Sequence, residues 1–157
     1  MVKIDEQGQV TILLALLNRR YESIEKIRER VYNISIWTLG VFLGAAGLIV
    51  QGNIQLDWPA KIFAALAETF AMVAVMFYLK DLEKGFRNQF RVTIQLEKAL
   101  GLSEPGAFGL DKGLLPPEWA EAGTKKAKGR FFRNTYLLLY LGAALLLAAN
   151  VSSGLLF

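Results

Sequence analysis

Residues 31–51, VYNISIWTLGVFLGAAGLIVQ, run for 21 positions without a charged side chain. Two later windows are similar, since residues 62–79 carry only the charge of Glu68 and residues 135–157 carry none. Apolar runs of about 18–25 residues have the length that crosses a hydrocarbon core roughly 30 Å thick. The sequence therefore predicts an all-α membrane protein with three transmembrane helices, at residues 31–51, 62–79 and 135–157, and excludes an ordinary water-soluble globule.

The composition excludes several kinds of chemistry. The 157 residues include no Cys and no His, so disulfides, zinc clusters, haem attachment and thiol nucleophiles are absent. The usual acid–base side chain at neutral pH is absent as well. No glycine-rich phosphate loop and no nucleophile–base set occurs. We therefore expect a protein that is not an enzyme and that has no metal or other cofactor.

Lysine and arginine are distributed unevenly around the three windows. Residues 1–30 carry six, residues 80–134 carry eleven, and the connector 52–61 carries only Lys61. Cytoplasmic loops of membrane proteins are the ones enriched in these residues. We expect a bacterial inner-membrane protein with a cytoplasmic N-terminus, an external turn at 52–61 and an external C-terminus.

Apolar stripes flank the first two windows. One recurs at heptad-like spacing before the first window and is interrupted by Arg20, and the other recurs every four residues after the second window. They predict that helices over 1–30 and 80–102 continue the first two spans into the cytoplasm and form a helical hairpin. Gly101 is expected to end the second of these helices as a C-cap. The stripes consist of Val10, Leu13, Leu17, Ile24, Ile27, Val31 and Ile34, and of Leu82, Phe86, Phe90 and Ile94.

Residues 103–134 are expected to form a cytoplasmic loop, because Gly and Pro punctuate residues 103–118. The end of this loop is basic and directly precedes the third window. Basic juxtamembrane residues attract anionic lipid, each by about 1 kcal/mol. We interpret them as lipid-headgroup contacts or as a signal that fixes topology, and we expect no nucleic-acid partner. The basic residues are Lys125, Lys126, Lys128, Arg130 and Arg133.

Small residues share one face of each of the first two predicted spans. In lipid, small residues mark the faces where helices approach closely, so both faces predict tight contacts, with each other or with a second copy of the chain. The glycine face, as we call it, consists of Asn33, Trp37, Gly40, Gly44, Gly47 and Gln51, and the alanine face of Ala60, Ala64, Ala67, Ala71 and Ala74.

Glu68 is the one charged residue inside a predicted span, where a carboxylate is costly and suggests function. At about 1.5 Å per residue, Glu68, Gly44 and Asn150 lie at a similar depth. We expect Glu68 to meet Asn150, or a second copy beside the Gly44 backbone. The alternatives are a structural residue held by a proton or a hydrogen bond, a pore-lining carboxylate, and a proton-coupled transport site. Asn33 and Gln51 are further intramembrane polar candidates.

Two classes of function remain. One is a homo-oligomer that surrounds a pore or perturbs the bilayer. The other is a membrane anchor or adaptor whose cytoplasmic helices recruit a protein partner. Three spans without a visible inverted repeat offer little for alternating access, so a transporter is disfavoured.

The layout of a leading cytoplasmic helix, a two-span hairpin and a helix from YLKDLEK (78–84) to LEKALGL (96–102) resembles the SLATT-type membrane effectors. These are small bacterial proteins of nucleotide-signalling anti-phage systems. The resemblance covers roughly residues 10–102 and implies a pore that opens when a cytoplasmic sensor protein triggers it. It supplies no catalytic motif, so no residue is assigned from it.

Overall fold

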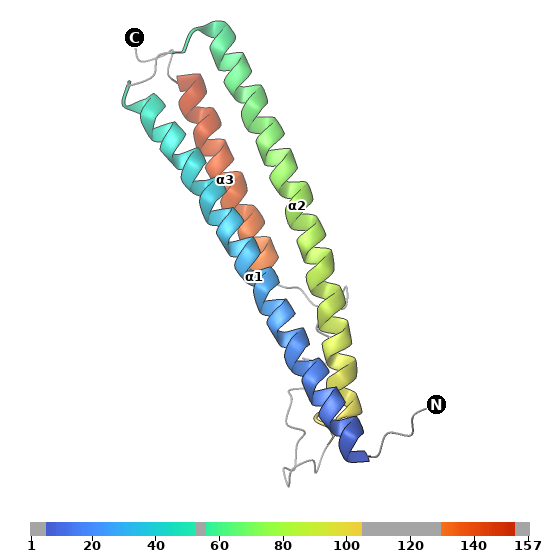
Figure 1. Ribbon diagram of the computed structural model, residues 1–157. Coiled ribbons are helices and arrows are strands. Elements are labelled where there is room, and N and C mark those ends of the chain that lie inside the picture. The colour runs from blue at the N-terminus through green and yellow to red at the C-terminus, as the bar shows by residue number, and fades with distance from the viewer. Residues whose placement is uncertain (1–5, 53–55, 105–129, 153–157) are drawn as a thin grey trace. The chain divides into compact units, whose positions relative to one another are not determined.

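The computed structural model describes residues 6–52, 56–104 and 130–152, and these form three helices (Figure 1). Helix α1 spans Glu6–Val50, α2 spans Trp58–Ala99 and α3 spans Arg130–Ser152. Each contains a segment that is long and apolar enough to cross a membrane, by length and composition alone. The prediction of an all-helical chain with three helices of this kind is confirmed.

Local chemistry sets both ends of α2. At its start, the Asp57 carboxylate accepts a hydrogen bond from the Ala60 N–H at 3.0 Å, which satisfies one of the unpaired donors of the first turn. At its end, Gly101 adopts a φ of 69°, and the Leu102 N–H donates to the Glu97 carbonyl at 3.1 Å. A left-handed glycine with this hydrogen bond is a Schellman cap. The C-cap predicted at Gly101 is therefore confirmed.

Two helix starts differ from the sequence-based boundaries. Helix α2 begins at Trp58, inside the expected 52–61 turn, and α3 begins at Arg130, inside the expected 103–134 loop. The windows were defined by the absence of charge, whereas arginine is a good helix former and enters the first turns of α3 readily. Arg130 and Arg133 therefore belong to α3.

The chain divides into two compact units. The first comprises residues 1–29 and 82–128, so its described part holds the start of α1 and the end of α2. The predicted stripes supply its buried apolar side chains, with Leu17 and Ile24 from α1 and Ile94 from α2. Ile27 lies 4.0 Å from the position of a Cβ built on Gly85. The α1 stripe from Leu17 to Ile27 and the α2 stripe therefore serve as contact surfaces between the two helix segments, whereas Val10, at the start of the α1 stripe, is 48% exposed.

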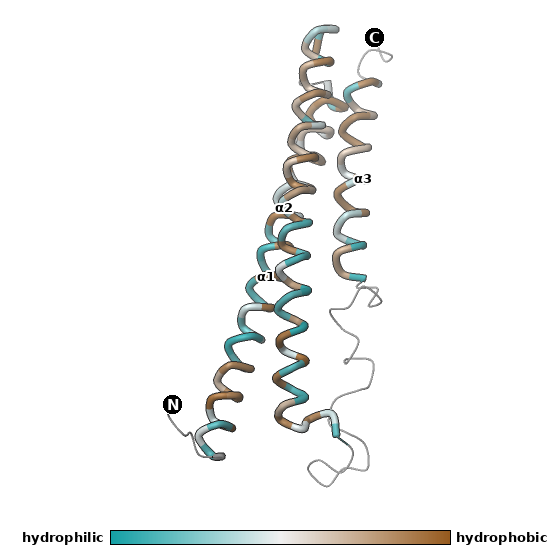
Figure 2. The backbone as a smooth tube through the Cα atoms, turned by 90° about the vertical axis from the view of Figure 1, so that its right-hand side faces the viewer, coloured by the Kyte–Doolittle hydropathy of each residue, from teal (hydrophilic) through white to brown (hydrophobic). Residues whose placement is uncertain are grey.

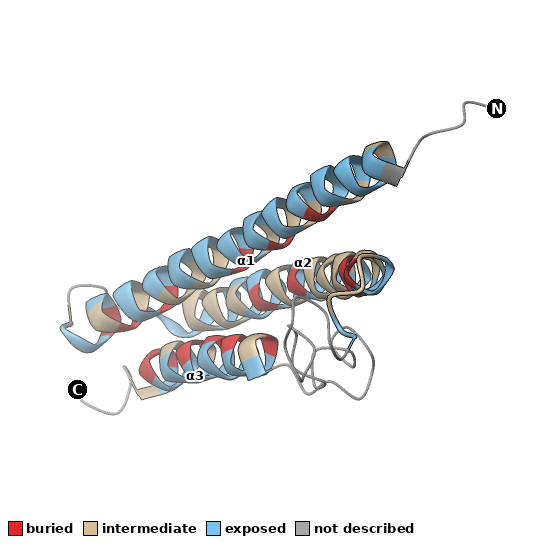
Figure 3. Ribbon diagram, turned by 90° about the horizontal axis from the view of Figure 1, so that it is seen from below, coloured by how far each residue is buried: buried red, intermediate tan, exposed pale blue. Residues whose placement is uncertain are grey.

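The second unit comprises residues 30–81 and 129–157, and holds the most apolar parts of the three helices (Figure 2). Its buried cluster joins α1 to α3 through Ala46, Ile49 and Ala149. Exposed residues, in pale blue, outnumber buried ones along all three helices (Figure 3). The exposed side chains of this unit include large aromatic ones, such as Phe63 at 79% and Phe70 at 75%.

Candidate functional site

Glu68 lies on α2 and faces α3 across a cavity of about 300 Å³. Apart from Glu68 and Thr69, the cavity is lined by apolar side chains and by Tyr140. The Thr69 hydroxyl donates to the Ala65 carbonyl of its own helix at 2.8 Å. Within residues 6–52, 56–104 and 130–152, no side chain forms an ion pair or hydrogen bond with Glu68. Glu68 therefore borders a space between α2 and α3.

The expected meeting of Glu68 with Asn150 does not occur within the chain. The Asn150 side-chain amide donates to the Lys61 carbonyl oxygen at 3.0 Å, which is seven residues, or about 10 Å, from Glu68 along α2. The expected depth was counted from residue 135. Because α3 begins at Arg130, Asn150 lies about 30 Å from its start rather than about 22 Å.

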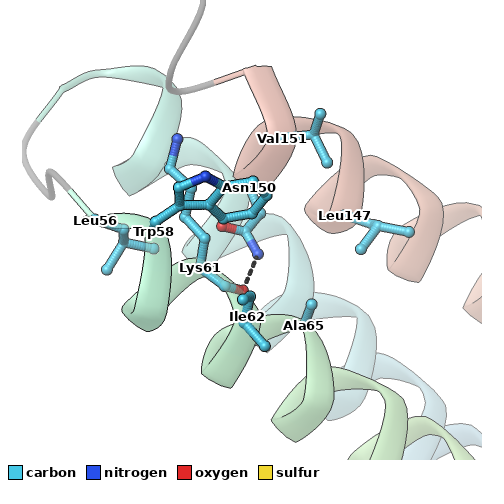
Figure 4. Close-up of a pocket in the computed structure, with 8 residues that line it drawn as sticks. All are labelled: Leu56, Trp58, Lys61, Ile62, Ala65, Leu147, Asn150 and Val151. Atoms are coloured by element: carbon cyan, nitrogen blue, oxygen red, sulfur yellow. Dashed lines mark hydrogen bonds between the residues drawn. The ribbon is translucent and has the colours of Figure 1, made fainter.

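A larger cavity, of about 610 Å³, lies between the start of α2 and the end of α3 (Figure 4). Its polar residues are Trp58, Lys61 and Asn150, of which Asn150 is almost completely buried. This cavity and the Glu68 cavity share Leu147 as a lining residue. A third cavity, of about 210 Å³, shares Met72, Val73 and Tyr140 with the Glu68 cavity and ends at Lys80. Together they line a groove along α2, which we call the α2–α3 groove.

The three glycines of the glycine face of α1 make no close contact with the described part of the chain. A Cβ built on Gly40, Gly44 or Gly47 meets nothing within 4 Å, and Trp37 is 75% exposed. At about 100° per residue, these glycines lie roughly opposite the face of α1 that buries Phe42 and Ile49. Asn33 and Gln51 lie on the same exposed side.

The alanine face of α2 is divided between the chain's interior and its surface. Ala60 and Ala64 are half-buried, whereas Ala67, Ala71 and Ala74 are exposed. The described structure therefore does not pack the glycine face against the alanine face. The second of the two possibilities, contact with another copy, stays a prediction.

The glycine that permits a close helix approach is one that sequence reasoning missed. A Cβ built on Gly142 of α3 lies 2.6 Å from Leu39 Cδ1 and 3.7 Å from Phe42 Cδ2, both on α1. Gly142 has no glycine at a spacing of three or four, so no repeated pattern pointed to it. Its location in an alanine- and leucine-rich window was the available signal.

The first unit contains two polar pairs that the apolar stripes did not reveal. The Arg20 guanidinium donates to Gln89 Oε1 at 2.7 Å. Arg20 interrupts the apolar stripe of α1, and this hydrogen bond gives its side chain a polar partner on α2. The Tyr21 hydroxyl donates to Glu97 Oε1 at 2.5 Å, and the Glu97 side chain is almost completely buried. The pKa of Tyr21 is raised to about 12, mainly by burial. The hydrogen bond to the Glu97 carboxylate and the negative charge of that carboxylate also raise the pKa of Tyr21.

The basic residues near the third helix are only partly described. Arg130 and Arg133 are exposed in the first turns of α3, while Lys125, Lys126 and Lys128 lie outside the described residues. In the described ranges, no group of three or more acidic side chains is placed to hold a metal ion. No protein family, curated protein or solved structure matches this chain.

Proposed function

We propose that the protein is an oligomeric, non-enzymatic effector of the bacterial inner membrane that forms a pore or perturbs the bilayer. The observation that carries this proposal is the exposed glycine face of α1, which lies opposite the helix's own intrachain contacts. The SLATT-type resemblance favours the same role, including a place in anti-phage defence and a cytoplasmic sensor protein as the trigger.

Membrane insertion is supported by the outward side chains of the second unit. Trp58, Phe63 and Phe70 each expose three quarters or more of their surface. A soluble monomer rarely exposes contiguous apolar surface on this scale, whereas a bilayer is a good solvent for it. The length of α3, 23 residues, corresponds to about 34 Å and suits a hydrocarbon core of roughly 30 Å.

Self-association is supported by the geometry of α1. Helices in lipid gain little from hydrophobicity toward one another and associate through close backbone approach. Gly40 and Gly44 form such a surface, and among the described residues no atom lies within 4 Å of a Cβ built on either glycine. A second copy of the chain is present in every membrane that contains this protein, so a partner for this surface is available. A three-helix monomer encloses no channel, so a pore requires contacts between copies.

Glu68 supports a pore over a passive anchor. An ionisable side chain inside a span marks water-filled paths by default, and Glu68 faces the α2–α3 groove with no pairing side chain in the described chain. In an oligomer that opens, its carboxylate supplies a polar lining and favours cations by charge.

Two assays test this function. The first follows a potential-sensitive dye after induced expression in a bacterium, and the second follows release of a trapped dye from liposomes that contain the purified protein. We expect depolarisation and release from the natural chain. The dye-release rate of the double variant G40I/G44I is expected to be at least tenfold lower than that of the natural chain. The variant is also expected to migrate as a smaller species in detergent, because two isoleucine side chains prevent the close approach of a second helix.

The matched control is Val41→Ile, which adds a methylene at a position of α1 that is 64% exposed and lies beside the glycine face. It is expected to behave as the natural chain does. Glu68→Gln tests the carboxyl group and is expected to reduce cation selectivity of the conductance. Unchanged potential together with tight liposomes, at confirmed insertion of the natural chain, would refute the pore.

The orientation is testable because the chain has no Cys. With the N-terminus inside, Gln51→Cys is expected to react with a membrane-impermeant maleimide in intact spheroplasts. Glu104→Cys is expected to react only after the membrane is permeabilised. The opposite pattern contradicts the assignment.

A membrane adaptor is the second candidate function, and one observation favours it. In the first unit, Val10, Ile12, Leu14 and Leu16 of α1 each expose 40% or more of their surface. Exposed apolar patches on water-facing units are protein contact sites. Intact membrane potential, with a cytoplasmic protein retained by the natural chain but not by I12E/L16E, would favour the adaptor.

A further inference from the structure

The cavity at the start of α2 combines one cationic side chain with an apolar wall. Lys61 contributes the only formal charge among its eight lining residues, and Ile62, Ala65, Leu147 and Val151 form the wall. The Lys61 side chain extends toward the beginning of α2, away from the deeper part of the groove (Figure 4). The cavity is therefore amphipathic along the helix axis, with its charge at the end where the helix begins.

We propose that this cavity binds one phospholipid with an anionic headgroup, whose phosphate contacts Lys61 and whose acyl chain lies along the α2–α3 groove. The proposal rests on the proposed function only in that the second unit lies in a bilayer, and it needs no pore. In the expected orientation, the lipid belongs to the external leaflet.

Charge complementarity favours an anionic lipid over a neutral lipid as the occupant. A lysine that borders apolar surface keeps its ammonium at the headgroup level while its methylenes contact hydrocarbon. The nearest acidic residue in sequence, Asp57, does not line the cavity and accepts the Ala60 N–H as the helix cap. The Lys61 charge is thus available to a phosphate, and a basic side chain near a membrane surface attracts anionic headgroups.

The remaining lining residues fit the two ends of such a lipid. Trp58 lines the cavity and is 76% exposed, and indole rings favour the headgroup level of a bilayer. The Asn150 amide donates to the Lys61 carbonyl, which fixes the end of α3 against α2 and holds the upper wall in place. Below them, the groove continues past Leu147 into the Glu68 cavity, so an acyl chain meets further lining residues beyond Ala65.

The test uses Trp58 as the reporter of lipid contact. The chain has three tryptophans, so W37F/W119F leaves Trp58 alone in the full-length chain. The protein is reconstituted in vesicles in which either phosphatidylglycerol or phosphatidylcholine carries brominated acyl chains, at equal mole fraction. We expect brominated phosphatidylglycerol to quench Trp58 at least threefold more strongly than the brominated neutral lipid does. Lys61→Gln is expected to abolish this preference while quenching by bulk lipid persists.

Two controls keep the result specific. W58F/W119F leaves Trp37, which is exposed on the glycine face, and is expected to show equal quenching by both lipids. Lys84→Gln, made in the Trp58 reporter, removes an exposed lysine of α2 that lines none of the three cavities and is expected to leave the preference intact.

Two outcomes count against the proposal. Equal quenching of Trp58 by the two lipids overturns the lipid site even where the liposomes leak, and leaves the pore standing. A preference that survives Lys61→Gln overturns the assignment of the phosphate contact. Conversely, a selective site in tight liposomes supports the lipid proposal and contradicts the pore.

Discussion

Replacing Gly142 is expected to separate the contacts within one chain from the contacts between chains. A Cβ at this position lies 2.6 Å from Leu39 Cδ1, whereas ordinary contact begins at 3.4 Å. The Leu39 side chain must therefore retreat by about 0.8 Å, the difference of the two distances. Since the obstructing atom ends a flexible side chain, Gly142→Ala is expected to cost about 1 kcal/mol, the range of one displaced rotamer. Gly142→Ile adds atoms toward Phe42 as well and is expected to cost about 3 kcal/mol, as overpacked cores do.

The matched control is Gly44→Ile, because Gly44 is also a helical glycine but has nothing within 4 Å of its Cβ position. The assay is reversible unfolding by SDS in mixed micelles, at a dilution where the chain is monomeric. Gly44→Ile is expected to change the free energy of unfolding by less than about 0.5 kcal/mol. Leu39→Ala, combined with Gly142→Ile, is expected to show a favourable coupling of about 1 kcal/mol or more. Equal destabilisation by the two isoleucines, or no coupling to Leu39, would refute the assigned helix contact.

Three further outcomes are expected from the helix ends and from the first unit. The pKa of Tyr21 is raised from 10.0 to about 12, so its stabilising contribution is present below pH 10 and is lost between pH 10 and 12. Unfolding at stepped pH should show this loss for the natural chain and not for Tyr21→Phe, which costs about 1 kcal/mol near neutral pH, because Tyr21 is partly exposed. Asp57→Ala is expected to lower stability by about 1 kcal/mol and Asp57→Asn by much less, measured by thermal unfolding, since asparagine also caps helices. Gly101→Ala is expected to cost about 1 kcal/mol because its φ of 69° suits glycine, and an unchanged melting temperature would contradict the cap.

The three helices were predictable because their signal is additive along the chain. A span is a sum of apolar residues over a fixed length, and that sum does not depend on what the helix packs against. The stripe containing Leu17 and Ile24 was predictable for a related reason, since a regular spacing places residues on one face. The cap at Gly101 was visible because glycine adopts the left-handed conformation at little cost.

The contacts between helices were not predictable in the same way. Spacing shows that Gly40 and Gly44 share a face, but the rotation of α1 about its axis decides whether that face turns inward. The structure turns it outward and uses the isolated Gly142 for the close approach. The predicted depth of Asn150 was wrong for a different reason. The depth was counted from residue 135, where the uncharged window begins, whereas helix propensity extends α3 back to Arg130.

The arrangement of α1, with intrachain contacts on one side and bare glycines on the other, has a consequence for symmetry. If the glycine face meets itself, the contact is isologous, a two-fold axis relates the copies, and this contact alone ends at a dimer. If it meets a different surface, such as the α2–α3 groove of the next copy, the contact is head-to-tail and repeats until a ring closes. Stoichiometry therefore reports on interface type. In a dimer, the glycines of two α1 helices face each other. In a ring with an odd number of copies, the glycine face of one copy contacts a second, distinct surface of the next copy.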